Sequence, residues 1–312
     1  MRKKIIEVNK LTKRYKKAKD LALDEVSFYV EKGAFFAFLG PNGAGKTTTV
    51  SILNTTLSKT KGDVIIDGLD IEKDSLEVRK NIGVIFQSPS LDKNLTAEEN
   101  IRFHVNLYGL YPYRFTFSMM DTKYQRKVIK MAKILGIEQD IHKPIKTFSG
   151  GMKRKLEILR SLMHEPKVLF LDEPTTGLDP ISRSNLWFYL KDLRKKKNVT
   201  IFLTTHYLEE AEDADYACLI NRGKVIAKGS PLEIKTQLIE RFMVVDAKDR
   251  KNLKKELKRF KVKVSGKGPY KVILNGSQPQ EIIQKVNVPL SLLEIHNPTL
   301  ERAYVEIIEK DS

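Results

Sequence analysis

The sequence contains very little cysteine and no long hydrophobic run. Cys218 is the one cysteine in 312 residues, so an intramolecular disulfide is excluded and a reducing compartment is favoured. The longest apolar stretches, such as 34–39 and 168–171, fall far short of the roughly 18 to 20 residues that a membrane-spanning helix needs. The first nine residues begin with a basic stretch and continue with a mixture of apolar and polar residues. They lack the apolar core of a signal peptide. We therefore expect no membrane span and no signal peptide.

What the sequence does have is a globular composition with a strong positive charge. Hydrophobic residues make up 41% and charged residues 30%, enough for one large and one smaller folded domain. The net charge of +17 suits either nucleic acid or the anionic inner face of a membrane. Basic runs occur at 153–155, 194–197 and 248–271, mostly with acidic neighbours. This mixture favours solvated surface over a dedicated basic interface.

The hydrophobic pattern predicts an α/β domain with a mainly parallel sheet. Phe35–Leu39, Val168–Leu171 and Val199–Leu203 are apolar without alternation, which is typical of strands buried on both faces. Each is followed directly by polar or glycine residues. Because ligands of such sheets bind beyond the carboxyl ends of the strands, one site is predicted there.

The remaining pattern divides the chain into two domains. We predict a large domain over 1–230, with an inserted helical lobe at about 88–165, then a linker over 231–241. Residues 242–312 follow the order β-α-β-β-α-β, ending in a helix from Thr299. That order is typical of a small α+β domain of the ferredoxin-like type.

A phosphate-binding loop follows the first buried strand. Its glycines let backbone N–H groups approach phosphate closely, and the start of the next helix favours negative charge. In this motif, Lys46 reaches the β- and γ-phosphates and Thr47 binds magnesium through its hydroxyl. The loop is Gly40-Pro41-Asn42-Gly43-Ala44-Gly45-Lys46-Thr47.

An acidic pair follows the second buried strand. Asp172 is placed where a carboxylate can hold a magnesium ion and its waters. Glu173 comes next, and a second carboxylate beside the metal can orient or deprotonate an attacking water. The loop predicts nucleotide binding, but kinases, GTPases and transport ATPases all share it, and an acidic pair after a strand can also be a helix cap or a solvated turn.

These motifs occur with four others, and together they resemble the ABC ATPase family over nearly the first 230 residues. Phe148 to Met152 resembles the signature motif of the family, with Ser149, Gly150 and Gly151 at its centre. The other elements are the glutamine of the Q-loop, Gln87; the D-loop, Gly177-Leu178-Asp179-Pro180; and the switch histidine, His206.

The resemblance implies a P-loop NTPase fold, with ATP and Mg²⁺ as ligands and Thr48 beside them. It implies that Glu173 polarises the water, that His206 contacts the γ-phosphate, and that Gln87 touches the metal or the water. Tyr15 matches the aromatic residue that stacks on adenine. In the family, ATP lies between one chain's phosphate loop and the other chain's signature motif, so a homo- or heterodimer is implied.

The resemblance extends to a branch of the family. Met152, the segment 174–180 and the ending Asn297 to Tyr304 look like the drug-exporter type. This implies a cytoplasmic subunit at the inner face of the membrane, serving a separate integral membrane permease without contacting the transported substrate. No nucleic acid is expected. The alternatives are a soluble ABC ATPase acting on ribosomes or nucleic acid, which the charge would suit, and a small-molecule kinase.

Overall fold

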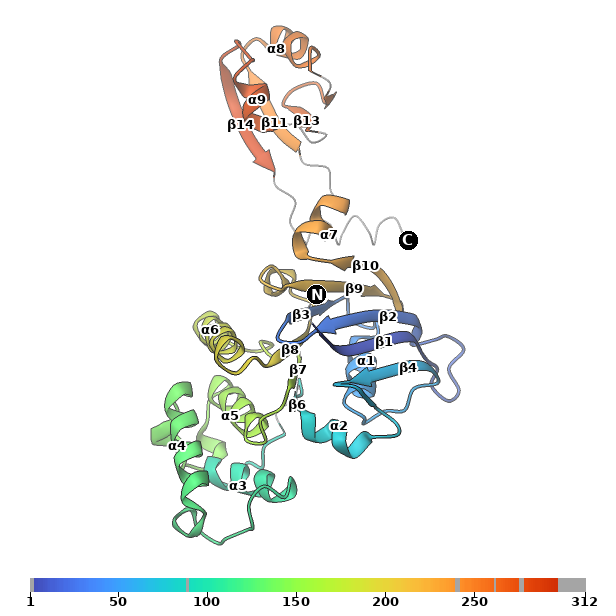
Figure 1. Cartoon of the computed structure of the whole chain (residues 1–312). Coiled ribbons are helices and arrows are strands. Elements are labelled where there is room, and N and C mark those ends of the chain that lie inside the picture. The colour runs from blue at the N-terminus through green and yellow to red at the C-terminus, as the bar shows by residue number, and fades with distance from the viewer. Residues whose placement is uncertain (1–2, 88–89, 239–241, 261, 275–277, 297–312) are drawn as a thin grey trace. The chain divides into compact units, whose positions relative to one another are not determined.

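The computed structural model describes residues 3–87, 90–238, 242–260, 262–274 and 278–296. The chain forms two compact units, 1–228 and 229–312, which we describe separately (Figure 1). The ending at 297–304 and the helix predicted from Thr299 lie outside the described residues.

A six-stranded sheet forms the centre of the first unit. Its order is β10-β9-β3-β8-β7-β6, and β9, β3, β8, β7 and β6 run parallel. The three apolar strands predicted from the sequence, β3, β7 and β8, are buried along their whole length. Their bounds are Phe35–Leu39 for β3, Ile82–Ile85 for β6, Val168–Asp172 for β7, Thr200–Thr205 for β8, Tyr216–Asn221 for β9 and Lys224–Gly229 for β10.

A second, antiparallel sheet shares its core with the first. Its order is β2-β1-β4-β5, and the ring of Phe28 on β2 lies 5.3 Å from that of Phe36 on β3. Phe36 in turn lies 5.0 Å from Phe202, which ties both sheets into one aromatic core. The strands are β1 (Lys4–Lys13), β2 (Leu23–Glu31), β4 (Lys61–Ile66) and β5 (Leu69–Asp70), and the unit also contains α1 (Lys46–Leu53), α2 (Ser75–Asn81) and α6 (Pro180–Lys197).

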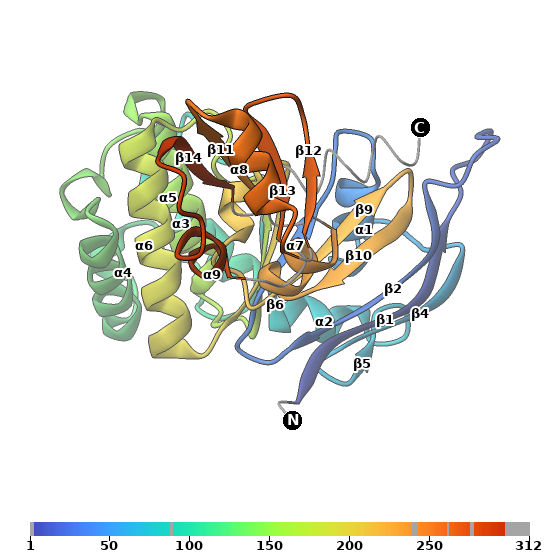
Figure 2. The same ribbon diagram turned by 90° about the horizontal axis from the view of Figure 1, so that it is seen from above.

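The helical lobe has a core of its own, built from α3 (Ala97–Leu107), α4 (Thr122–Leu135) and α5 (Gly150–Leu162). At its centre the buried Tyr124 hydroxyl donates to Glu98 (2.9 Å), and Arg102 pairs with Glu98 at 3.1 Å. The lobe lies on one side of the first unit, with β1, β2 and β4 on the other (Figure 2). Within the lobe, the segment 111–120 is irregular apart from one short 3₁₀ turn.

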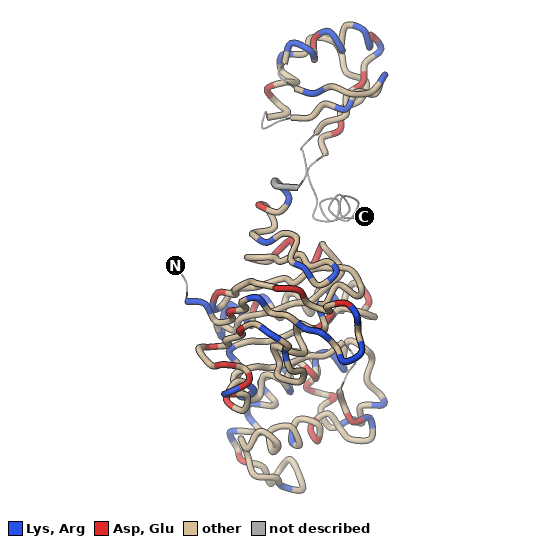
Figure 3. Tube along the Cα trace, turned by 90° about the vertical axis from the view of Figure 1, so that its right-hand side faces the viewer, with Lys and Arg blue, Asp and Glu red and all other residues tan. Residues whose placement is uncertain are grey.

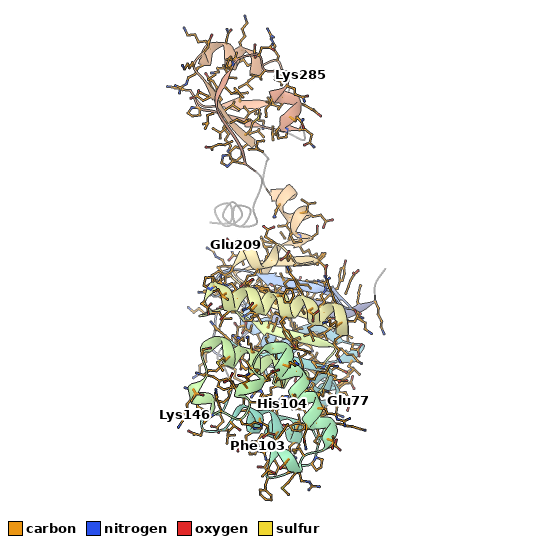
Figure 4. All side chains as sticks on the ribbon, turned by 90° about the vertical axis from the view of Figure 1, so that its left-hand side faces the viewer. Glu77, Phe103, His104, Lys146, Glu209 and Lys285 are labelled. Atoms are coloured by element: carbon orange, nitrogen blue, oxygen red, sulfur yellow. The ribbon has the colours of Figure 1, made fainter. Side chains whose placement is uncertain are left out.

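Two histidines of the lobe pack against the same tyrosine ring. The rings of His104 (labelled in Figure 4) and His164 lie 4.5 and 4.3 Å from that of Tyr108. Burial, with a smaller contribution from Arg160, lowers the pKa of His104 to about 3. His104 is therefore neutral at physiological pH.

The second unit contains the elements β11-α8-β12-β13-α9-β14 in chain order, after the helix α7. Its antiparallel sheet has the order β12-β13-β11-β14. Part of the segment predicted as a linker is helical, since it forms α7 (Pro231–Leu238). The other bounds are Phe242–Ala247 for β11, Arg250–Leu257 for α8, Lys263–Ser265 for β12, Tyr270–Ile273 for β13, Pro279–Ile283 for α9 and Leu290–His296 for β14.

Lysine and arginine residues are spread along the chain in both units, with acidic residues among them (Figure 3). Cys218 is buried in the first unit as a free thiol. Within the described residues, we find no helix with the length and apolar character required to cross a membrane.

Candidate functional site

The phosphate loop connects the end of β3 to the start of α1. Lys46, the first residue of α1, is buried, and its Nζ atom donates to the carbonyl oxygens of Gly40 (2.8 Å) and Pro41 (3.2 Å). Burial lowers the pKa of this lysine, while the carboxylate of Glu173 opposes the shift. The ammonium group is thus held over the loop where a phosphate would be bound.

Two glycines of the loop have backbone requirements that other residues would not meet. Gly45 has a φ of 107°, and a Cβ there would lie 2.7 Å from Leu23. A Cβ on Gly40 would lie 2.3 Å from the carbonyl oxygen of Ile220. A side chain at either position would therefore collide with its neighbours, and glycine lets the backbone of the loop approach an anion closely.

The acidic pair lies at the carboxyl end of β7, beside the phosphate loop. Asp172 is buried and accepts a hydrogen bond from the hydroxyl of Thr204 on β8. Burial raises its pKa, although the Thr204 hydrogen bond and Lys46 act in the opposite direction. Glu173 has a φ of 45°, an uncommon conformation for a residue with a side chain. Such strain is frequent at functional sites, and here it turns the carboxylate toward the loop.

Glu173 brings together three of the residues predicted from the sequence. Its carboxylate lies 3.5 Å from Lys46 Nζ and 3.2 Å from His206 Nδ1. It also accepts a hydrogen bond of 3.3 Å from Gln87 Nε2. These three partners come from α1, from the residue after β8 and from the segment after β6. The carboxyl ends of three parallel strands and the phosphate loop thus form one cluster.

A cavity of about 590 Å³ opens over this cluster. Its volume lies within the roughly 300–1,000 Å³ of small-molecule sites. Ten predicted site residues line it: Pro41, Asn42, Gly43, Gly45, Lys46, Thr47, Thr48, Gln87, Glu173 and His206.

The site is also suited to a magnesium ion. This metal prefers oxygen ligands and keeps several waters. Thr47 and Gln87 line the cavity, and the buried Asp172 carboxylate is near enough to Lys46 to interact with it electrostatically. Among the described residues, Thr204 is the only hydrogen-bond partner of the Asp172 side chain, so this buried carboxylate retains capacity for a cation or its waters.

Tyr15 lies at the edge of the phosphate loop but does not line the cavity. Its hydroxyl is 3.2 Å from the Thr48 hydroxyl, and 44% of its surface is exposed. The ammonium group of Lys13 lies 5.4 Å from the centre of its ring. One contact thus connects the tyrosine to the loop, and stacking on adenine stays a prediction.

The signature residues lie outside this cavity. Ser149 caps α5 by accepting a hydrogen bond from the Met152 backbone N–H (3.2 Å), and Asp179 caps α6 in the same way through Ser182 (3.0 Å). Neither they nor Gly150 and Gly151 line the space over the phosphate loop. The signature residues are therefore not part of the cavity that this chain forms over its own phosphate loop.

Arg154 is a buried residue next to the site, and the sequence did not single it out. In the sequence it belongs to the basic run 153–155, which was expected to be solvated. In the structure, only 4% of the surface of Arg154 is exposed. Its guanidinium donates to the carbonyl oxygens of Phe86 (2.6 Å), Gln87 (3.2 Å) and Pro174 (2.8 Å), and it pairs with Glu157 at 3.0 Å. It thus connects the signature helix to the segments that carry Gln87 and Glu173.

Three cavity-lining residues were also missed, namely Ala22, Thr176 and Tyr207. Thr176 and Tyr207 are each close in sequence to a predicted residue, and the ring of Tyr207 lies 4.0 Å from that of His206. Proximity to a motif is the signal that could have identified them. Ala22 precedes β2 and carries no chemical signal, so the sequence offered no means to find it.

The chain is similar to known proteins over much of its length. Residues 23–176 match the family model described as "ABC transporter". The chain is 37% identical over 233 residues to the "Probable multidrug ABC transporter ATP-binding protein YbhF" of Escherichia coli, covering 75% of this chain but 38% of YbhF. It is also 37% identical over 249 residues to the "Doxorubicin resistance ATP-binding protein DrrA" of Mycobacterium tuberculosis, covering 80% of this chain and 72% of DrrA.

A solved structure shares the fold of the first unit. The cassette MJ0796, described as dimeric in a post-hydrolysis state with ADP and Pi bound, matches with a TM-score of 0.64 and 25% identity. The match covers 72% of this chain and 98% of that one.

Proposed function

The chain belongs to the ABC transporter family as one of its ATP-binding ATPase subunits, and from this premise we propose that it hydrolyses Mg-ATP to power an exporter. The observation that carries the proposal is the convergence of Lys46, Gln87 and His206 on the Glu173 carboxylate, at 3.2 to 3.5 Å. Hydrolysis requires the general base to lie close to the groups that hold the phosphate and the water, and these distances meet that requirement.

In the proposed reaction, each residue has a separate task. Lys46 and the loop N–H groups hold the β- and γ-phosphates and neutralise their charge. Glu173 accepts a proton from the attacking water, which Gln87 helps to position, and His206 contacts the γ-phosphate. Phosphoryl transfer depends mainly on positioning and charge, which is why no side-chain nucleophile is required.

Thr47, Gln87 and Asp172 would hold the magnesium ion. When bound, the ion supplies positive charge that neutralises the β- and γ-phosphate oxygens. The Asp172 carboxylate, whose pKa burial raises, stays ionised beside such a charge.

We propose that two such subunits close over ATP. The signature residues Ser149, Gly150 and Gly151, with Asp179, would complete the site of the opposite chain. Their position outside this chain's own cavity and the dimeric MJ0796 relative support this. The partner would be a second copy or a related subunit.

Ser149→Asp tests this closure. Aspartate keeps the ability to cap α5, so the subunit should still fold and bind ATP. Its carboxylate would, however, repel the γ-phosphate of the opposite site. We expect the ATP-dependent dimer to be lost and ATPase activity to fall by about tenfold or more, measured by light scattering and phosphate release.

Ser118→Asp is the matched control, since it adds the same charge to a loop of the same lobe. It should dimerise and turn over like the unmodified protein. Normal ATP-dependent dimerisation of Ser149→Asp would contradict the proposed arrangement.

We also propose that this subunit lies at the inner face of the membrane and serves a separate permease of the export type. This proposal is supported by the names of YbhF and DrrA, by Met152 and by the segment 174–180. The transported substrate would not contact this chain, and no nucleic acid is involved.

Affinity purification of the tagged chain from detergent-solubilised cells tests the partner. We expect a polytopic membrane protein in stoichiometric amount. Ribosomes or nucleic acid in its place would overturn the transport proposal and leave the ATPase, which is the outcome that the alternative function requires.

For the C-terminal unit, we propose the ferredoxin-like fold and a packing or dimer-stabilising role. The strand order β12-β13-β11-β14 and the two intervening helices support the fold. The proposed domains are 1–230, with the lobe at about 88–165, and 242–312, joined by 231–241.

A further inference from the structure

A second cavity lies between the helical lobe and the sheet. It has a volume of about 730 Å³ and is bounded by α4 of the lobe, by α6 and by the turns that precede β3, β7 and β8. Figure 4 looks toward α6 and the lobe helices that enclose it. The turn residues Lys32, Lys167 and Val199 precede the same strands that carry the nucleotide site at their other ends. Because these strands are parallel, the two cavities lie at opposite edges of the sheet.

The floor of this cavity is apolar. Leu162, Pro166, Leu193 and Val199 are buried, and Met131 is half-buried beside them. These side chains come from α4, α5 and α6 and from the turns before β7 and β8, so both the helical lobe and the sheet domain contribute to the apolar surface. Apolar surface of this kind favours the hydrocarbon part of a ligand.

The rim is strongly basic. Seven basic and two acidic residues line the cavity. The acidic side chains are already paired, Glu165 with Lys127 at 2.8 Å and Asp192 with Lys196 at 2.9 Å. Four cations have no ion pair among the described residues: Lys32, Arg126, Lys130 and Lys197. They come from three separate segments of the chain, so the excess charge arises from the fold and not from one basic run.

Tyr189 adds a neutral donor to this rim. Burial raises the pKa of its phenol, so the hydroxyl keeps its proton at physiological pH. It lies on α6, within the lining of the cavity. An anion there would meet cations on both α4 and α6 and a hydrogen-bond donor on α6.

We propose that this cavity binds a small amphiphilic anion, with its phosphate or carboxylate group among Lys32, Arg126, Lys130 and Lys197 and its apolar body on the floor. The volume is that of a small-molecule site. Charge alone would suit a free phosphate and an apolar floor alone would suit a neutral amphiphile; the combination fits a molecule with both parts. The ligand would contact the lobe and the sheet simultaneously.

Calorimetric titration with octyl phosphate, inorganic phosphate and octyl glucoside tests the proposal. The full chain is kept in saturating Mg-ADP, so that the phosphate loop is already filled. We expect one octyl phosphate to bind per chain, at least about tenfold more tightly than either of the other probes, because each of them lacks one of the two contacts. The proposal would be overturned if octyl phosphate did not bind, or if it bound no more tightly than inorganic phosphate or octyl glucoside.

Two double variants test whether octyl phosphate binds at the rim of this cavity. Arg126→Gln with Lys130→Gln should weaken octyl phosphate binding by about tenfold, while both side chains are exposed and the fold should be preserved. The control, Lys93→Gln with Lys146→Gln, removes the same charge from exposed positions of the lobe (Lys146 is labelled in Figure 4). Equal weakening by both pairs would show attraction to net charge only, and the site would be rejected.

Discussion

Glu173→Gln is expected to bind ATP as well as the unmodified protein and to hydrolyse it about 10² to 10⁴ times more slowly. The amide keeps the size of the side chain and its contact with Gln87, so the phosphate loop is preserved. It cannot accept a proton from water, and it does not carry the negative charge that faces Lys46 and His206 at 3.5 and 3.2 Å. Nucleotide affinity by calorimetry and phosphate release under single-turnover conditions measure the two properties separately.

The control for this variant is Glu209→Gln. Glu209 is an exposed carboxylate three residues after His206 and is labelled in Figure 4. The same chemical change there should leave both affinity and turnover as they are. Turnover by Glu173→Gln at the rate of Glu209→Gln would remove Glu173 from the reaction and transfer the role of base to another group.

Arg154→Met is expected to lower the free energy of unfolding of the first unit by about 3–5 kcal/mol, because it leaves the buried Glu157 carboxylate without its cation. It also removes donors to the carbonyl oxygens of Phe86, Gln87 and Pro174. The segments that hold Gln87 and Glu173 lose a common anchor, so ATPase activity should fall as well. Urea unfolding followed by tryptophan fluorescence measures the change, since Trp187 is the only tryptophan of the chain and lies in this unit.

Lys153→Met provides the comparison at the adjacent position. Lys153 is half-buried and forms no ion pair with the described residues, so its replacement should change stability by no more than about 0.5 kcal/mol. Similar unfolding midpoints for the two variants would mean that the Arg154 network contributes little, and the role assigned to it would be wrong.

Much of the first unit could be predicted because its signals are local. The strands β3, β7 and β8 are recognisable from consecutive apolar residues, and the phosphate loop is a continuous segment with its glycines at fixed spacing. The structure places Lys46, Gln87, Glu173 and His206 around one cavity, as the carboxyl-end rule for parallel sheets predicted. Their chemical roles stay predictions until the variants are measured.

Arg154 shows why the rest could not be predicted. In the sequence it stands between two lysines, and nothing within a few residues distinguishes it from them. Its partners Phe86 and Gln87 are 68 and 67 residues away along the chain. A guanidinium is buried only where distant backbone carbonyls converge on it, and this convergence is a property of packing.

The sequence by itself determined the chemical groups of this protein and their order: a phosphate loop, an acidic pair after a buried strand, a signature segment and a histidine. These depend on residue type and short spacing, which folding does not change. Only the tertiary structure decided which charges are buried, which are paired and which remain free, as with Arg154 inside the unit and Lys32, Arg126 and Lys130 around the second cavity. The physical reason is that the energy of a charge depends on its solvent exposure and on partners within a few ångströms, and both are set by segments far apart in the chain.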